Sequence, residues 1–120
     1  MDLRLSRIIL FTANLEAMTA FYRDVIGLAV VGREAGWVEF DAGGCAIALH
    51  AGRGRPGARP PKLAFHTPDV AAARAALARR GMTTLGPVKS GAHIDLCDGA
   101  DPDGNPIQLS SRPPASRLPG

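Results

Sequence analysis

The sequence has few of the features that mark secreted, membrane or redox proteins. Its 120 residues include two cysteines, Cys45 and Cys97, which are too few for a disulfide framework. No apolar run approaches the roughly 20 residues that a membrane-spanning helix needs, and the residues from Met1 to Arg4 do not resemble the start of a signal peptide. We therefore expect a cytoplasmic protein with free thiols and no membrane partner.

Short phosphate-binding and catalytic motifs are also missing, and so are signatures of nucleic-acid binding. There is no Gly-rich phosphate loop, no Gly-x-Ser-x-Gly turn and no Cys-x-x-Cys pair. The formal net charge is +3, but much of the excess lies in the Gly/Pro-rich segment 52–61 and after Ser111, and aromatic residues make up only 5% of the chain. A basic Gly/Pro segment is typical of a solvated linker, so we expect no nucleic-acid partner.

What the sequence does contain is an internal repeat. Arg7 and Asn14 have counterparts in Lys62 and Asp69, each 55 positions later (62 − 7 and 69 − 14). In both copies a strand-like segment leads into a helical pattern that ends at a glycine, Gly27 or Gly81. A repeat of this length indicates that one supersecondary unit is used twice.

Each copy is predicted to form one strand, one helix and three further strands. Asn14 and Asp69 are expected to cap the helices, and Gly27 and Gly81 to end them in the left-handed conformation. The predicted strands cover 5–12, 28–32, 37–41 and 45–50 in the first unit, and 62–67, 83–89, 92–97 and 106–110 in the second. We predict a single domain over 1–111 with units 3–51 and 62–111, a linker at 52–61 and a flexible tail at 112–120.

Three segments carry a resemblance to a known family. Asn14-Leu15 precedes a Phe-Tyr-Arg-Asp-Val-Ile-Gly-Leu run over 21–28, Leu63-Ala64-Phe65 precedes Asp69-Val70, and Asp-Pro-Asp-Gly-Asn-Pro-Ile covers 101–107. In this order and spacing, the chain resembles the vicinal oxygen chelate superfamily of glyoxalases, bleomycin-resistance proteins and dioxygenases. The resemblance implies an α+β fold of two βαβββ modules whose curved sheets surround a cleft, a small-molecule ligand and a homodimer.

Strand alternation sorts the side chains between a helix-packed face and a cleft face. On the first strand, for example, Ile8 and Leu10 go under the helix, which leaves Arg7, Ile9 and Phe11 for the cleft. The same sorting places Ile94 and Leu96 under the second helix and Cys97 in the cleft. The candidate ligand-binding residues are Arg7, Phe11, Trp37, Glu39, Ala48, His50, Lys62, His66, His93, Asp95 and Gln108.

The resemblance implies four positions at which metal-using members carry His or Glu. In this sequence they are occupied by Arg7, Ala48, Lys62 and Gln108. None of these is a good ligand at neutral pH, because Arg and Lys are protonated, Ala has no donor atom and the Gln amide is a weak neutral donor. We therefore expect neither a metal nor another cofactor.

Several functions remain open at this stage. Arg7 and Lys62 suit an anionic, amphipathic ligand, as in a metal-free binding protein of the bleomycin-resistance type, or they only neutralise Glu39 and Asp95. An enzymatic alternative is a lyase, isomerase or dioxygenase-like activity that uses a displaced metal site or an acid–base histidine, built from His50, His66 and Asp95. A nucleophilic role for Cys97 and a closed cleft in an interaction protein are further alternatives.

Overall fold

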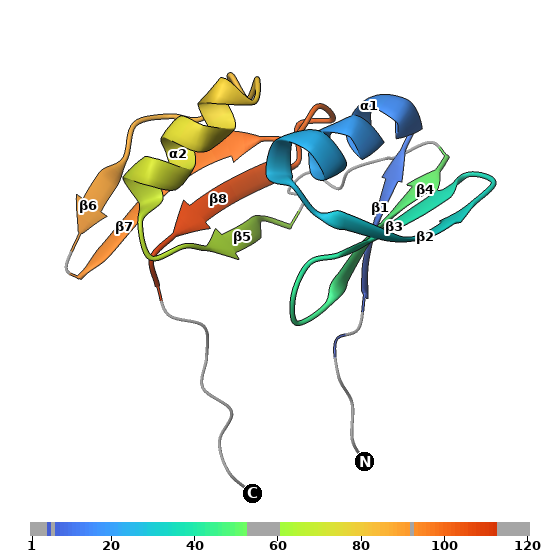
Figure 1. The fold of residues 1–120 in the computed structure, drawn as a ribbon, viewed down its shortest axis with the longest axis horizontal. Helices are drawn as coiled ribbons and strands as arrows, with labels where there is room; N and C mark the ends of the chain where they lie inside the picture. The colour runs from blue at the N-terminus through green and yellow to red at the C-terminus, as the bar shows by residue number, and fades with distance from the viewer. Residues whose placement is uncertain (1–4, 6, 53–60, 92, 113–120) are drawn as a thin grey trace, which may run out of the picture. The chain divides into compact units, whose positions relative to one another are not determined.

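The computed structural model describes residues 5, 7–52, 61–91 and 93–112. The chain forms two compact units, Met1–Pro60 and Pro61–Gly120, each built on a four-stranded mixed sheet (Figure 1). The predicted α+β fold of two modules is confirmed. Residues 53–60 of the predicted linker and 113–120 of the predicted tail lie outside the described residues.

In the first unit the strands are arranged in the order β1-β4-β3-β2. Strand β1 runs parallel to β4, and the other neighbours are antiparallel. The predicted elements are confirmed to within about two residues at their ends. They are β1 (Arg7–Thr12), α1 (Leu15–Ala20), the π-helical segment η1 (Phe21–Ile26), β2 (Ala29–Glu34), β3 (Trp37–Asp41) and β4 (Ala46–Ala51).

The helical segment covers one face of this sheet and buries an apolar core. Met18, Tyr22, Phe40 and Leu49 have no exposed surface. Asn14 is the N-cap residue of α1, as predicted, but its side chain makes no capping hydrogen bond. Instead the hydroxyl of Thr12 accepts a hydrogen bond from the Asn14 backbone N–H (2.9 Å), which turns the chain from β1 into the helix.

The second unit repeats the arrangement with the strand order β5-β8-β7-β6. Helix α2 packs on β7 and β8, and Val70 and Leu77 of the helix and Ile107 and Leu109 of β8 are buried. The Asp69 cap is confirmed, since its carboxylate accepts a hydrogen bond from Ala72 N–H (3.0 Å). The elements are β5 (Leu63–His66), α2 (Val70–Arg79), β6 (Lys89–Gly91), β7 (Ile94–Ala100) and β8 (Pro106–Ser110).

The predicted strand over 83–89 is wrong for residues 83–88, which form no strand. Two carbonyls of this segment, on Leu85 and Gly86, accept hydrogen bonds from the Arg74 guanidinium of α2 (3.0 and 2.7 Å). The segment therefore bonds to the helix. It reaches the backbone of β7 through Gly86 N–H, which donates to the Asp98 carbonyl, and through the Thr84 hydroxyl, which donates to the Ala100 carbonyl and accepts from its N–H. Gly99 permits the close approach, because a Cβ there would lie 3.0 Å from the Leu85 side chain.

Both helical segments end at a left-handed glycine, as predicted, with φ of 89° at Gly27 and 99° at Gly81. At Gly81 an added Cβ would meet no atom within 4 Å, so the cost of a side chain there comes from the backbone conformation alone. No helix among the described residues is long and apolar enough to cross a membrane.

We expect Gly81→Ala to lower the free energy of unfolding by about 1–2 kcal/mol, the usual cost of placing an L-residue in the left-handed region. Gly44→Ala is the matched control, because Gly44 has equal open space but no positive φ. Urea denaturation of the three proteins measures the difference. Equal losses in both variants would show that the helix does not end as described.

Candidate functional site

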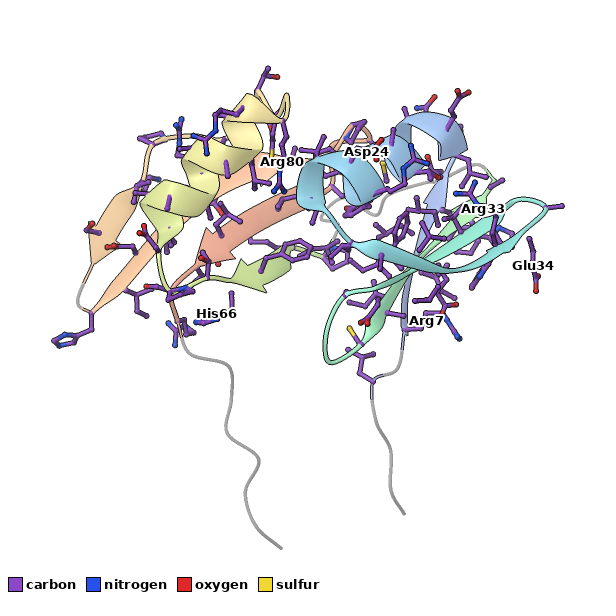
Figure 2. All side chains as sticks on the ribbon, in the orientation of Figure 1. Arg7, Asp24, Arg33, Glu34, His66 and Arg80 are labelled. Atoms are coloured by element: carbon purple, nitrogen blue, oxygen red, sulfur yellow. The ribbon has the colours of Figure 1, made fainter. Side chains whose placement is uncertain are left out.

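The face of the first sheet opposite α1, here called the first open face, carries three rows of side chains across β1, β4 and β3. Backbone pairing sets the rows as Arg7–Ala46–Asp41, Ile9–Ala48–Glu39 and Phe11–His50–Trp37. Figure 2 labels Arg7 on the side of the sheet away from α1. The predicted placement of these residues on one face is therefore confirmed for the first unit.

Arg7 and Glu39 form a two-pronged ion pair on the first open face. The Arg7 Nε and Nη2 atoms donate to the two Glu39 carboxylate oxygens at 2.8 and 3.2 Å. The side chains that β4 places between these strands are alanines, Ala46 and Ala48, which leave room for Arg7 to cross β4. The Arg7 guanidinium also lies 5.8 Å from the centre of the Trp37 ring, within cation–π distance.

Beside this ion pair lies an aromatic cluster formed by the third row. The His50 ring is 5.1 Å from the Phe11 ring and 5.7 Å from the Trp37 ring, centre to centre. Phe11 leaves 55% of its surface exposed. His50 Nδ1 lies 2.9 Å from the Ala51 carbonyl, which can only accept, so Nδ1 carries the proton and Nε2 is the acceptor of the neutral ring.

The face of the second sheet opposite α2, the second open face, contains a related ion pair. The Asp98 carboxylate accepts hydrogen bonds from Lys62 Nζ and Gln108 Nε2, both at 3.1 Å. These hydrogen bonds, that from Lys62 first, hold the pKa of Asp98 below its ordinary value against the opposing effect of burial. Asp98 lies opposite Gln108 on β8, just as Glu39 lies opposite Ala48 on β4. The Lys62–Asp98 and Arg7–Glu39 ion pairs therefore take equivalent places in the repeat.

The predicted faces of β7 are wrong. Cys97 is in register with the buried Leu109 and has no exposed surface, so it faces α2, and the neighbouring Asp95 is not on the open face. His93 is an exposed turn residue with a φ of 72°, between β6 and β7. Ile94 and Leu96, predicted to be buried, lie on the open face instead.

These corrections change which candidate residues come together. Lys62 pairs with Asp98 rather than with Asp95. The displaced site predicted from His50, His66 and Asp95 is not formed as expected. His66 is in register with Ser110 and Leu96 on the open face of the second sheet, whereas Asp95 lies on the opposite face. Among the described residues, no three His, Cys, Asp or Glu side chains form a group suited to a metal ion. Asp98 was missed, although it precedes Gln108 by about the interval that separates Glu39 from Ala48.

The four positions for which the resemblance implies metal ligands do not fit a metal in this chain. Arg7 and Lys62 are cations, each already bound to a carboxylate of its own unit. Ala48 offers no donor atom, and the Gln108 amide N–H₂ donates to Asp98. A divalent ion would meet positive charge where it needs anionic or neutral donors, so no chemistry that requires a metal is assigned to these residues.

A pocket of about 460 Å³ lies on the second open face. Its volume is within the range of about 300–1,000 Å³ typical of small-molecule sites. Of the predicted site residues it includes Gln108. Its lining consists of Lys89, Ser90, Gly91, Ile94, Leu96, Gln108, Ser110 and Arg112.

Comparison with known proteins agrees with this architecture. The chain belongs to the Glyoxalase/Bleomycin resistance protein/Dioxygenase superfamily, whose sequence model matches residues 4–109. None of the curated proteins with which the sequence was compared matches it significantly.

Solved structures share the fold. An integron cassette protein from the mobile metagenome of V. cholerae is 26% identical, with a TM-score of 0.70 over 94% of this chain and 98% of that one. A glyoxalase/bleomycin resistance protein/dioxygenase from Nocardioides is 19% identical, with a TM-score of 0.78 over 99% and 91%. Lactoylglutathione lyase from Agrobacterium tumefaciens is 20% identical, with a TM-score of 0.73 over 92% and 94%. At such identities the last two show the fold alone.

The environments of the two cysteines predict different reactivities. Burial raises the pKa of the Cys97 thiol, which argues against the nucleophilic role considered above, whereas Cys45 is partly exposed. We expect a disulfide reagent such as Ellman's reagent to modify one thiol of the native protein rapidly. The fast phase should disappear in Cys45→Ser and persist in Cys97→Ser, and rapid modification of both thiols would contradict the assignment.

The lowered pKa of Asp98 predicts a pH-dependent contribution to stability. Its charged form is favoured in the folded state, so the contribution is present above the unfolded pKa of about 3.9 and is lost as the pH falls through the lower folded pKa. Both partners are nearly half exposed, and solvent screening limits the gain to about 1 kcal/mol or less.

We expect Asp98→Asn to destabilise the protein at pH 7 and to match the wild type at pH values below the folded pKa. Thermal unfolding across this range measures the effect. Asp95→Asn, an exposed carboxylate of the same strand, is the control that should show a smaller difference. An Asp98→Asn effect that does not change with pH would contradict the role of the ion pair.

Proposed function

We propose that this protein is a metal-independent small-molecule binding protein of the bleomycin-resistance type. The observation that carries the proposal is the aromatic cluster of the first open face, where Phe11 leaves 55% of its surface exposed beside His50 and Trp37. Exposed aromatic side chains next to a fixed polar group are typical of ligand-binding surfaces. The cluster suits the planar, apolar part of an amphipathic ligand.

The polar part of the ligand meets the Arg7–Glu39 ion pair. Arg7 and Lys62 were the basis for expecting an anionic ligand, but each already neutralises a carboxylate within its own unit. An anion that bound to Arg7 would have to displace Glu39 from a bidentate pair. The apolar contact with Phe11 and Trp37 is therefore the main contribution to binding at this face.

The enzymatic alternative receives no support from the arrangement of its residues. Its displaced site needs His50, His66 and Asp95 together, and Asp95 lies on the helix side of its sheet, so only acid–base work by a single histidine would be left to it. We keep the family expectation of a homodimer as part of the proposal, with light scattering as its test.

The chain's one tryptophan, Trp37, lies in the proposed site and reports on it directly. We expect 2-naphthol, a planar neutral probe, to quench Trp37 fluorescence in a saturable way. Phe11→Ala should weaken binding by roughly thirtyfold, because burying a Phe ring contributes about 2 kcal/mol.

Val31→Ala is the matched control, since Val31 is also an exposed apolar residue of the first unit but lies on β2, outside the cluster. Its affinity should equal that of the wild type. Equal losses in Phe11→Ala and Val31→Ala, or no saturable quenching by planar probes, would contradict the proposed site.

A further inference from the structure

The pocket of the second open face combines an apolar surface with positive charge. Pairing across β6, β7 and β8 puts Lys89, Leu96 and Ser110 in one row, and Ile94 follows on the same face. Ile94 and Leu96 are only partly buried, although both are large and apolar. Two partly exposed aliphatic side chains next to each other offer a surface for the apolar body of a ligand.

The charge of this pocket is not balanced within the described part of the chain. Lys89 and Arg112 line it, no carboxylate does, and neither cation forms a salt bridge with a described residue. Asp98, on the same face of β7, is already bound by Lys62 and Gln108, and Lys89 contributes least to the lowering of its pKa. The pocket therefore differs from the two ion pairs, in which each cation has a partner.

A buried hydroxyl adds a directed hydrogen-bond donor. Ser110 is 8% exposed, and its Oγ accepts a hydrogen bond from the Arg112 backbone N–H at 3.1 Å. Because this bond uses a lone pair of the oxygen, the Ser110 proton is left to donate to another group. An acceptor in the pocket would thus meet one hydroxyl donor and two cationic donors.

We propose that this pocket binds an organic anion, in which a carboxylate or phosphate contacts Lys89, Arg112 and Ser110 and an apolar body contacts Ile94 and Leu96. The inference builds on the proposed small-molecule binding function and names the chemical class of ligand. It assigns the recognition of negative charge to Lys89 and Arg112 rather than to Arg7 and Lys62.

The test compares probes that differ in charge but not in shape. We expect calorimetry to show that phenylacetate binds at least about tenfold more tightly than its neutral analogue phenylacetamide, and that added NaCl weakens the binding. Tighter binding of phenyl phosphate than of phenylacetate would indicate a phosphate site, and weaker binding would indicate a carboxylate site. Inorganic phosphate should bind more weakly than phenyl phosphate, because it lacks the apolar body.

Variants locate the site. Lys89→Gln and Arg112→Gln should each weaken phenylacetate binding about tenfold or more, the usual effect of losing a charge-assisted hydrogen bond. Arg33→Gln removes the same charge from an exposed residue of β2 in the other unit and should bind like the wild type. Circular dichroism confirms that each variant is folded.

Amide NMR spectra separate this inference from the proposed function. Phenylacetate should shift the signals of residues 89–96 and 108–112, whereas 2-naphthol should act on Trp37 and lose affinity in Phe11→Ala. Absence of the 2-naphthol effect alone would contradict the proposed site on the first open face but not the anion pocket. Equal affinity for phenylacetate and phenylacetamide, or unchanged binding in both Lys89→Gln and Arg112→Gln, would overturn the anion pocket.

Discussion

In each unit a basic side chain at the start of the first strand binds a carboxylate from the third strand of the same sheet. Arg7 binds Glu39, and Lys62 binds Asp98. Arg7 and Lys62 are two of the positions for which the family resemblance implies metal ligands, and here each forms a balanced pair of charges instead. Because these cations are already paired, the residues around the ion pairs determine the character of each open face. In the first unit these are aromatic, and in the second they line a pocket.

The ion pairs affect the charge of the open faces more than they affect the stability of the fold. Their side chains are partly exposed, and pairs of this kind contribute about 0.2–1 kcal/mol. A fully buried side chain such as Tyr22, Phe40 or Ile107 contributes about 1.5–3 kcal/mol by leaving water. The core under α1 and α2 therefore stabilises the sheets, and side chains on the open faces can change with little effect on folding.

Local patterns predicted most of the fold. The repeat, the Asp69 cap, the glycines at 27 and 81 and the extent of β3 follow from spacing and residue type, and the structure confirms them. The open face of the first unit also followed from alternation. The ion pair between Arg7 and Glu39 was one of two stated alternatives, because alternation shows which residues share a face but not which of them bond.

The second unit shows why alternation alone was insufficient. Ile94 and Leu96 are the large apolar residues of β7, so they were assigned to the core, whereas the smaller Cys97 takes the buried position opposite Leu109. Segment 83–88 looked like a strand, but Arg74 binds its carbonyls from α2. Both differences arise from contacts between separate elements, which the alternation within one strand does not show.

We propose that organic ligands, and not a metal ion, bind to the open sheet faces. Native mass spectrometry of the protein, purified from cells without chelators, tests it most directly. We expect the mass of the chain or of its dimer, bare or with an organic adduct, and no stoichiometric zinc, nickel, iron or manganese. A stoichiometric divalent metal that dissociates only with a chelator would contradict it, because two paired cations, an alanine and an amide cannot hold such an ion.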